Sequence, residues 1–148
     1  MRPDGLRRLL VVEDSESDLA LLQEALVEDG GDLELDVVRH GEDALAFLHR
    51  EAPFGDATLP DLVVLDLNLP RLGGFEVLKA LRADVDAQLR RLPVVVFTTS
   101  RNVSDVERAY DLHASSFMTK PSAFDHYVRA VEAFRDFWLG VAQLPSGS

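Results

Sequence analysis

The sequence of 148 residues contains no cysteine, which excludes disulfide bridges, thiol nucleophiles and thiolate metal sites. No apolar run approaches the roughly 20 residues that a membrane-spanning helix needs, and no signal-peptide core follows Met1. Positive charge is also scarce: 15 Lys and Arg stand against 26 Asp and Glu, for a formal net charge of -11. Because binding to nucleic-acid phosphates rests on Lys and Arg, we expect no nucleic-acid partner. The lack of cysteine, of a signal peptide and of a long apolar run leads us to expect a cytoplasmic protein with no membrane partner.

Common catalytic signatures are missing as well. The histidines are scattered without metal-ligand spacing, and no serine has the His/Asp frame of a serine nucleophile. Neither a Gly-Lys-Ser/Thr phosphate-binding loop nor a dinucleotide fingerprint occurs. The excess of acidic residues is typical of a solvated surface, but part of it can also form a metal pocket, and both interpretations can hold together.

The sequence does contain a regular alternation of apolar runs and helical patterns. Continuous apolar runs are typical of strands buried on both faces of a parallel sheet. Strands are predicted at 9–12, 33–38, 61–66, 93–97 and 115–119, and helices from Ser15 or Ser17 to Gly30-Gly31 and at 41–51, 75–83, 103–112 and 122–141. This order predicts an α/β fold with a doubly wound, five-stranded parallel sheet. We predict one domain over residues 1–148, with a core at about 7–133, a C-terminal helix extension at about 134–145 and no output domain.

Chemically useful side chains follow four of the predicted strands: Glu13 and Asp14 the first, Asp66 the third, Thr98 the fourth and Lys120 the fifth. Because the carboxyl ends of parallel strands meet at one edge of the sheet, we expect these residues to lie together. Two unit charges about 5 Å apart repel by roughly 3 kcal/mol at an effective dielectric of about 20. Three acids placed together therefore need a cation. Oxygen ligands without cysteine or paired histidine favour Mg²⁺ or a similar hard divalent ion.

Lys120 and Thr98 supply the opposite polarity. Their ammonium and hydroxyl groups can contact oxygens held between them and the metal. Transfer of a phosphoryl group is stabilised mainly by positioned cations and hydrogen-bond donors. We therefore expect Asp66 to act as a nucleophile that forms an acyl phosphate.

The sequence resembles the receiver domain of two-component response regulators. The resemblance extends from Leu9 to about Leu144 and rests on the motifs Val12-Glu13-Asp14, Val64-Leu65-Asp66-Leu67-Asn68-Leu69-Pro70, Gly73-Gly74, Phe97-Thr98 and Lys120-Pro121. It implies a flavodoxin-like fold with strand order 2-1-3-4-5. It also implies a sensor histidine kinase as phosphodonor and a signalling role rather than an enzymatic one.

The resemblance assigns a role to each motif residue. Asp66 matches the phosphoacceptor, and Glu13 and Asp14 match the acid pocket. Mg²⁺ would be bound by the side chains of Asp14 and Asp66 and by the backbone carbonyl of Asn68.

A second set of implied roles concerns the response to phosphorylation. Thr98 would contact the phosphoryl group, and Lys120 would pair with it. Phe117 matches the aromatic residue that turns inward as the threonine moves. The signal would be a conformational change of the face built from 103–112, 115–119 and 122–141.

A narrower resemblance is to single-domain regulators that pair with phytochrome histidine kinases. It rests on the segments 12–18, 110–113 and 132–145. It implies a bacteriophytochrome kinase as the partner.

The end of the last predicted helix is apolar on more than one side. Packing against the sheet is the simplest explanation for part of this pattern, but we expect some of these side chains to form a homodimer seam or partner surface. The predicted surface comprises Tyr110, Phe134, Phe137, Trp138, Leu139 and Val141.

Two other functions remain open at this point. An aspartate-nucleophile phosphohydrolase would also use a strand-end aspartate and Mg²⁺. Such enzymes usually carry a second aspartate two residues further on, where this sequence has Asn68, which cannot transfer protons. The other alternative is a phosphorylation-independent interaction module with a vestigial pocket, against which the intact set of pocket residues argues.

Overall fold

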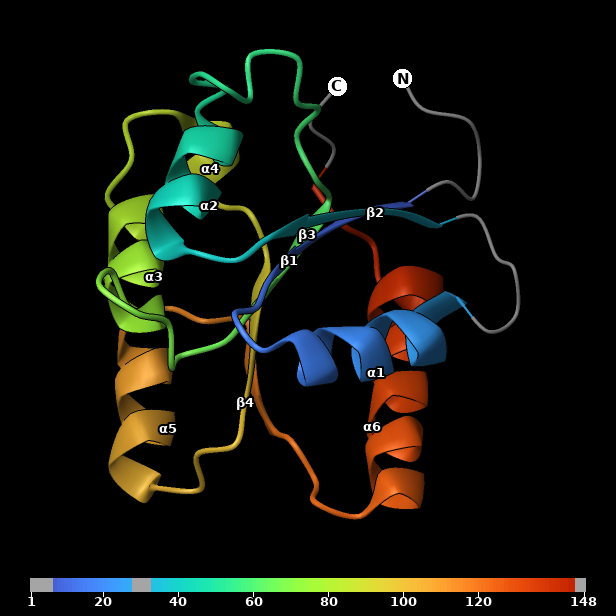
Figure 1. Ribbon diagram of the computed structural model, residues 1–148. Helices are drawn as coiled ribbons and strands as arrows, with labels where there is room; N and C mark the ends of the chain where they lie inside the picture. Colours follow the sequence, from blue (N-terminus) through green and yellow to red (C-terminus); the bar gives the residue numbers. More distant parts are fainter. Residues whose placement is uncertain (1–6, 28–32, 146–148) are drawn as a thin grey trace.

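The computed structural model describes residues 7–27 and 33–145, and it contains the predicted parallel sheet (Figure 1). The sheet has five strands in the order β2-β1-β3-β4-β5, as predicted. The strands are β1 (Arg7–Val12), β2 (Leu33–Val38), β3 (Leu62–Leu65), β4 (Val94–Thr98) and β5 (Ser116–Thr119). The helices are α1 (Glu16–Val27), α2 (Gly41–Leu48), α3 (Gly74–Arg82), α4 (Ala87–Arg90), α5 (Val103–Asp111) and α6 (Phe124–Asp136), followed by the π-helix η1 (Phe137–Val141).

Apolar side chains alternate between the two faces of the sheet, and both faces are covered. In β1, Leu9 and Val11 pack in the core formed with α1 and α6, whereas Leu10 and Val12 pack in the core formed with α2, α3 and α5. Figure 1 shows the same division, with α1 and α6 on one side of the strands and α2, α3 and α5 on the other. The central strands are therefore continuous apolar runs because each successive side chain has a helix to pack against.

The edge strands differ from the central ones. β2 lies at one edge of the sheet, which agrees with its alternating apolar and polar residues. β5 lies at the other edge, and all four of its residues are half-buried. Residues 28–32 are outside the described part of the chain, so the predicted helix stop at Gly30-Gly31 is outside it too.

Two helical features depart from the prediction. Residues 87–90 form α4, capped by Asp86 Oδ1, which accepts a hydrogen bond of 2.9 Å from the Gln88 N–H. A helix of one turn has no detectable apolar period, so the sequence pattern did not indicate it. The predicted final helix is divided into α6 and η1, and the wider π-turns begin at Phe137. Across residues 7–27 and 33–145, no helix combines the length and the apolar character that crossing a membrane requires.

Candidate functional site

The carboxyl ends of the strands bring Glu13, Asp66, Thr98 and Lys120 together, as the sequence predicted. Backbone bonds continue the ladder past the strands: Asp66 N–H donates to Val12 C=O at 3.1 Å, and Lys120 N–H donates to Thr98 C=O at 2.6 Å. All four side chains are buried. Buried charges are costly unless they are paired, so their partners explain how the fold tolerates them.

Lys120 is the centre of this cluster. Its Nζ donates to Glu13 Oε1 at 2.5 Å, Asp18 Oδ2 at 2.9 Å and Asp66 Oδ2 at 3.4 Å. An ammonium has three N–H donors, so each can be directed at one carboxylate. Burial alone would lower the pKa of Lys120, but the hydrogen bonds to Glu13 and Asp18 and the charge of Asp66 raise it above its ordinary value. Lys120 is therefore a permanent cation in the site.

Asp18 is a site residue that the sequence reasoning missed. It lies in the first turn of α1, where an acidic residue has an ordinary explanation in the helix dipole. Its backbone N–H donates to Ser15 Oγ at 3.3 Å, so Ser15, one of the two predicted caps, is the residue that caps α1. The only sequence signal for the role of Asp18 was its position one helical turn after the acidic pair that follows β1.

Asp66 has different neighbours on its two carboxylate oxygens. Oδ1 accepts a hydrogen bond of 3.2 Å from the backbone N–H of Asn68, while Oδ2 faces the Lys120 ammonium. The exposed Asn68 side chain reaches in the other direction, and its Nδ2 donates to Thr98 Oγ1 at 3.4 Å. Asn68 therefore connects the aspartate at the end of β3 with the hydroxyl at the end of β4.

The start of α3 is packed directly against the backbone of Asp66. A Cβ atom on Gly74 would overlap the Asp66 carbonyl oxygen and would lie only 2.8 Å from Leu67 Cα. The Gly74 N–H also donates to the Leu67 carbonyl at 3.2 Å. Gly74 is therefore required here, because only a residue without a Cβ allows the start of α3 to approach the Asp66 backbone this closely.

The acidic residues do not form the three-carboxylate cluster that we expected. Glu13 Oε1 is taken by Lys120 and Oε2 accepts the Ser15 N–H at 3.0 Å, so Glu13 is a counter-ion of Lys120 rather than a free metal ligand. Within the described residues, no group of three His, Cys, Asp or Glu side chains is arranged to hold a metal. Burial raises the pKa of Glu13 above its ordinary value, although the hydrogen bond from Lys120 acts to lower it.

The remaining donors still suit a hard divalent cation. Asp14 follows Glu13 directly and is exposed, Asp66 carries a carboxylate, and Asn68 contributes a backbone carbonyl on the exposed loop after β3. All of these atoms are oxygens. Mg²⁺ commonly retains several waters and needs only one or two protein carboxylates, so this smaller donor set fits it.

Of the two predicted switch residues, Thr98 ends β4 and Phe117 lies in β5, next to α5. Phe117 is half-buried and packs against the core on the α3 and α5 side. Its backbone N–H donates to the Tyr110 hydroxyl at 3.2 Å. Ser100 forms a second link that the sequence reasoning did not find. Its Oγ donates to Asp105 Oδ2 in α5 at 2.6 Å, and its carbonyl accepts from Thr119 Oγ1 at 2.9 Å.

The predicted partner surface needs one correction. Phe134 is only 5% exposed and packs in the core beneath α1 and α6, so it leaves that surface. Phe137 and Val141 are 52% and 76% exposed, whereas Trp138 and Leu139 are half-buried against the same core. Phe134 lies three residues after buried Val131, on the same face of α6, so it continues the row of inward-facing side chains of this helix. The exposed apolar residues begin where the π-helix begins.

Comparison with known proteins identifies the class to which this fold and this site belong. Residues 9–132 match the response regulator receiver domain, and the chain belongs to this family. Receiver domains are phosphoacceptor signalling proteins rather than classical enzymes. They typically bind a divalent metal, and in two-component systems their phosphodonor is a histidine kinase.

Within the family, the chain is similar to regulators linked to phytochromes. It is 40% identical to the response regulator Rcp1 of Synechocystis sp. over 138 residues, which are 93% of this chain and 92% of Rcp1. The structure of the phosphorylated cyanobacterial phytochrome response regulator RcpA matches with a TM-score of 0.90 and 40% identity, over 95% of this chain and 99% of that one. The Mn²⁺-bound form of Rcp1 matches with a TM-score of 0.88 and 38% identity, over 95% and 99%. The bacteriophytochrome response regulator RtBRR matches with a TM-score of 0.72 and 38% identity, over 97% and 86%.

Proposed function

We propose that this receiver accepts a phosphoryl group on Asp66 from the phosphohistidine of a sensor histidine kinase, with Mg²⁺ as the cofactor. The observation that supports this most directly is the buried Lys120 ammonium, which lies 3.4 Å from Asp66 Oδ2 and is held there by Glu13. A fixed cation beside a carboxylate stabilises the charge of a transferring phosphoryl group.

In the proposed reaction Asp66 attacks phosphorus through a carboxylate oxygen. The P–N bond of the phosphohistidine breaks, a P–O bond to Asp66 forms, and the bonding electron pair stays on the ring nitrogen. With its other nitrogen protonated, the imidazole leaves as a neutral base. Lys120 pairs with a phosphoryl oxygen and Thr98 donates a hydrogen bond to another. Asp14, Asp66 and the carbonyl of Asn68 would hold Mg²⁺, which supplies charge stabilisation to the same oxygens.

The phosphorylated state is proposed to change the face built from α5, β5 and α6. Thr98 moves toward the phosphoryl group, and Phe117 turns further inward. This is a shift between two populated states, driven by contacts that only the phosphorylated state makes. The half-buried position of Phe117 in the present structure supports the assignment, because the side chain has room to become more buried.

The proposed phosphodonor is a bacteriophytochrome kinase. The support is the similarity to RcpA and RtBRR, which are described as phytochrome and bacteriophytochrome response regulators. Each match covers at least 95% of this chain.

We further propose that the chain forms a homodimer through its C-terminal segment. Phe137 and Trp138 are stacked edge to face with their ring centroids 5.1 Å apart, and Phe137 presents half of its surface to solvent. Val141 lies one helical turn further on and is largely exposed. Apolar side chains gathered on one segment favour a partner surface that also includes Leu139 and, on the face of α5, Tyr110.

A phosphohydrolase is the enzyme alternative, and the site argues against it. Asn68 occupies the position where such an enzyme needs an acid/base residue, and its amide donates to Thr98. An amide cannot take up or release the proton of a leaving group. Repeated turnover of a phosphomonoester, lost in Asp66→Ala, would support the enzyme and contradict the receiver role of Asp66.

The proposal is tested by labelling the full chain with acetyl phosphate and Mg²⁺. Intact-mass measurement should show one added phosphoryl group in the wild type and none in Asp66→Asn. Asp56→Asn, an exposed loop aspartate, is the matched control and should be labelled like the wild type. An unlabelled wild type would contradict the proposal, and a label that persists in Asp66→Asn would place the acceptor at another residue.

A further inference from the structure

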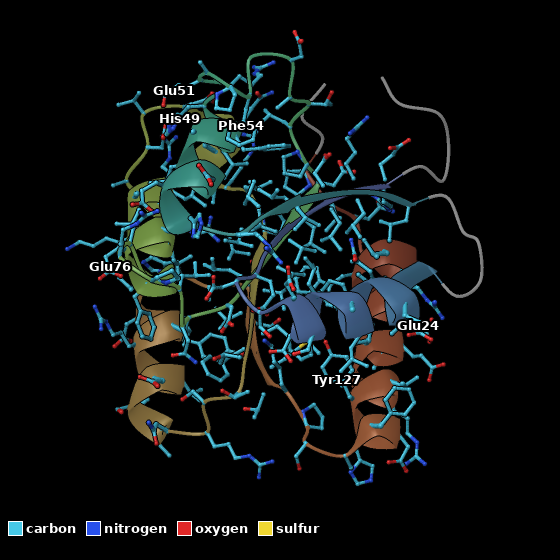
Figure 2. The ribbon with its side chains drawn as sticks, viewed as in Figure 1. Glu24, His49, Glu51, Phe54, Glu76 and Tyr127 are labelled. Carbon is cyan, nitrogen blue, oxygen red and sulfur yellow. The ribbon has the colours of Figure 1, made fainter. Side chains whose placement is uncertain are left out.

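Asp18 is the one partner of Lys120 that comes from a helix rather than from the end of a strand. It is held on both sides: its N–H donates to Ser15 Oγ at 3.3 Å, and its carbonyl accepts from the Tyr127 hydroxyl at 3.4 Å. Tyr127 lies on α6, on the side that faces α1 (Figure 2). The Asp18 carboxylate is thus placed beside Lys120 by both helices that cover this face of the sheet.

The three carboxylates around Lys120 differ in their access to water. The side chain of Asp18 is 32% exposed, against 5% for Glu13 and 8% for Asp66. Glu13 has the shortest contact with the ammonium, and its second oxygen is bound by the Ser15 N–H. If Lys120 left Glu13, a buried carboxylate would lose its counter-ion, which is strongly unfavourable. If it left Asp18, water could replace it.

A phosphoryl group on Asp66 adds oxygens that need a donor, and all three N–H groups of Lys120 are already committed. We propose that Asp18 is a positioning residue that holds Lys120 while Asp66 is unphosphorylated and releases it when the phosphoryl group arrives. This inference rests on the proposed function, because it requires phosphorylation of Asp66. Asp18 then competes with the phosphoryl group for the same ammonium.

The release also changes the molecular surface. Asp18 lies on the wall of a groove of about 390 Å³ that opens between α1 and α6 beside the site. The groove is lined further by Leu21, Arg101, Pro121, Phe124 and Tyr127. A carboxylate that loses its ammonium adds a free negative charge to this wall. Phosphorylation of Asp66 would thereby change the surface charge on the α1–α6 side of the protein, in addition to the conformational change on the α5–β5 side.

The test uses beryllofluoride with Mg²⁺ as the phosphoryl mimic, titrated into the full chain by calorimetry. Asp18→Asn removes the competing charge, so the dissociation constant for beryllofluoride should fall about three- to fivefold, the upper part of the range expected for one partly exposed charge pair. Glu16→Gln is the matched control, since Glu16 lies in the same helical turn and pairs with Arg39 on the surface. Its dissociation constant should stay within about twofold of the wild type.

A spectroscopic readout separates positioning from a structural role. In the wild type, the ¹³C carboxyl resonance of Asp18 should shift on addition of beryllofluoride, and that of exposed Asp125 should not. An unchanged or increased dissociation constant in Asp18→Asn, or a stationary Asp18 resonance, overturns the inference. If Asp18→Asn does not fold, the wild-type resonance decides alone. A wild type that binds no beryllofluoride overturns the proposed function, and this inference with it.

Discussion

Asn68 Nδ2 lies 3.4 Å from Thr98 Oγ1, and the backbone N–H of Ser100 points at the same oxygen from 3.4 Å. Both contacts are made by donors, so Thr98 Oγ1 is the acceptor in each. Its own O–H proton is left for an acceptor, and the proposed phosphoryl group on Asp66 would provide one. The unphosphorylated site thus already orients the hydroxyl as a donor.

Thr98→Val tests this orientation. The substitution keeps the shape of the buried side chain but leaves the Asn68 and Ser100 donors without their acceptor, and one lost charge-stabilising donor commonly costs tenfold or more in rate. We expect labelling by acetyl phosphate to slow about tenfold and the free energy of unfolding to fall by about 1–2 kcal/mol. Thr99→Val, at the exposed neighbouring position, should change neither. An unchanged labelling rate in Thr98→Val would contradict the role of the hydroxyl.

Gly74→Ala should disrupt the site through the backbone. The new methyl group would collide with the Asp66 carbonyl oxygen and Leu67 Cα, neither of which is the end of a flexible side chain. Overpacking of this kind costs about 1–3 kcal/mol, and here the atoms that must move carry the proposed acceptor. Urea unfolding should show a lower free energy of unfolding, and labelling by acetyl phosphate should be impaired. Gly55→Ala is the control, because its Cβ would meet nothing within 4 Å.

The ion pair between His49 and Asp84 predicts a pH-dependent stability. His49 Nε2 lies 2.6 Å from Asp84 Oδ2, and Nδ1 lies 2.9 Å from the Leu45 carbonyl, so both ring nitrogens face acceptors. The hydrogen bond with Asp84 raises the pKa of His49 above its ordinary value. Figure 2 shows His49 with Glu51 and Phe54 near the C-terminal end of α2.

Because the folded-state pKa is raised, the stabilisation is complete below the unfolded pKa of about 6.5 and is lost as the pH rises through the folded value. His49 is 37% exposed, so the effect should be less than about 1 kcal/mol. The midpoint temperatures of thermal unfolding of the wild type and of His49→Gln should differ more at pH 6 than at pH 9. In an Asp84→Asn background the pH dependence of this difference should disappear. A difference that is constant across pH would contradict the pairing.

The proposed dimer surface can be tested without disturbing the core. Trp138→Ala should weaken dimerisation and leave phosphorylation intact, but Trp138 also packs on the core. Phe137→Ser and Val141→Ser alter side chains that are more than half exposed, and each should weaken the dimer about tenfold if it is an interface anchor. Phe124→Ser, at an equally exposed aromatic residue that begins α6, is the control. Equal dimer dissociation constants for the wild type, Phe137→Ser and Val141→Ser, measured by sedimentation equilibrium, would contradict the proposed dimer surface.

The cluster of Glu13, Asp66, Thr98 and Lys120 could be predicted from the sequence because each residue directly follows, or ends, a strand of the parallel sheet. The topology of a parallel sheet then places such residues together, whatever their separation along the chain. Asp18 could not be found in this way. It comes from a helix, where the rotation of the first turn decides whether an acidic side chain faces the site or the solvent.

The end of the chain was predictable only in part for a similar reason. Apolar spacing shows that α6 has an inward stripe, but not where the stripe stops. Phe134 continues it and is buried, while the change to π-helical turns at Phe137 rotates the following residues. α4 escaped prediction because one turn stabilised by the Asp86 cap and the buried Leu89 has no periodic signal.

The contact of Tyr110 with β5 has a consequence for aggregation. β5 is an edge strand, and an edge strand with free amides is a template on which another chain can extend the sheet. The Tyr110 hydroxyl occupies the outward amide of Phe117, near the middle of this short strand. An incoming strand would have to displace α5 before it could pair. By occupying this amide, Tyr110 hinders the addition of a strand from another chain to the open edge of the sheet.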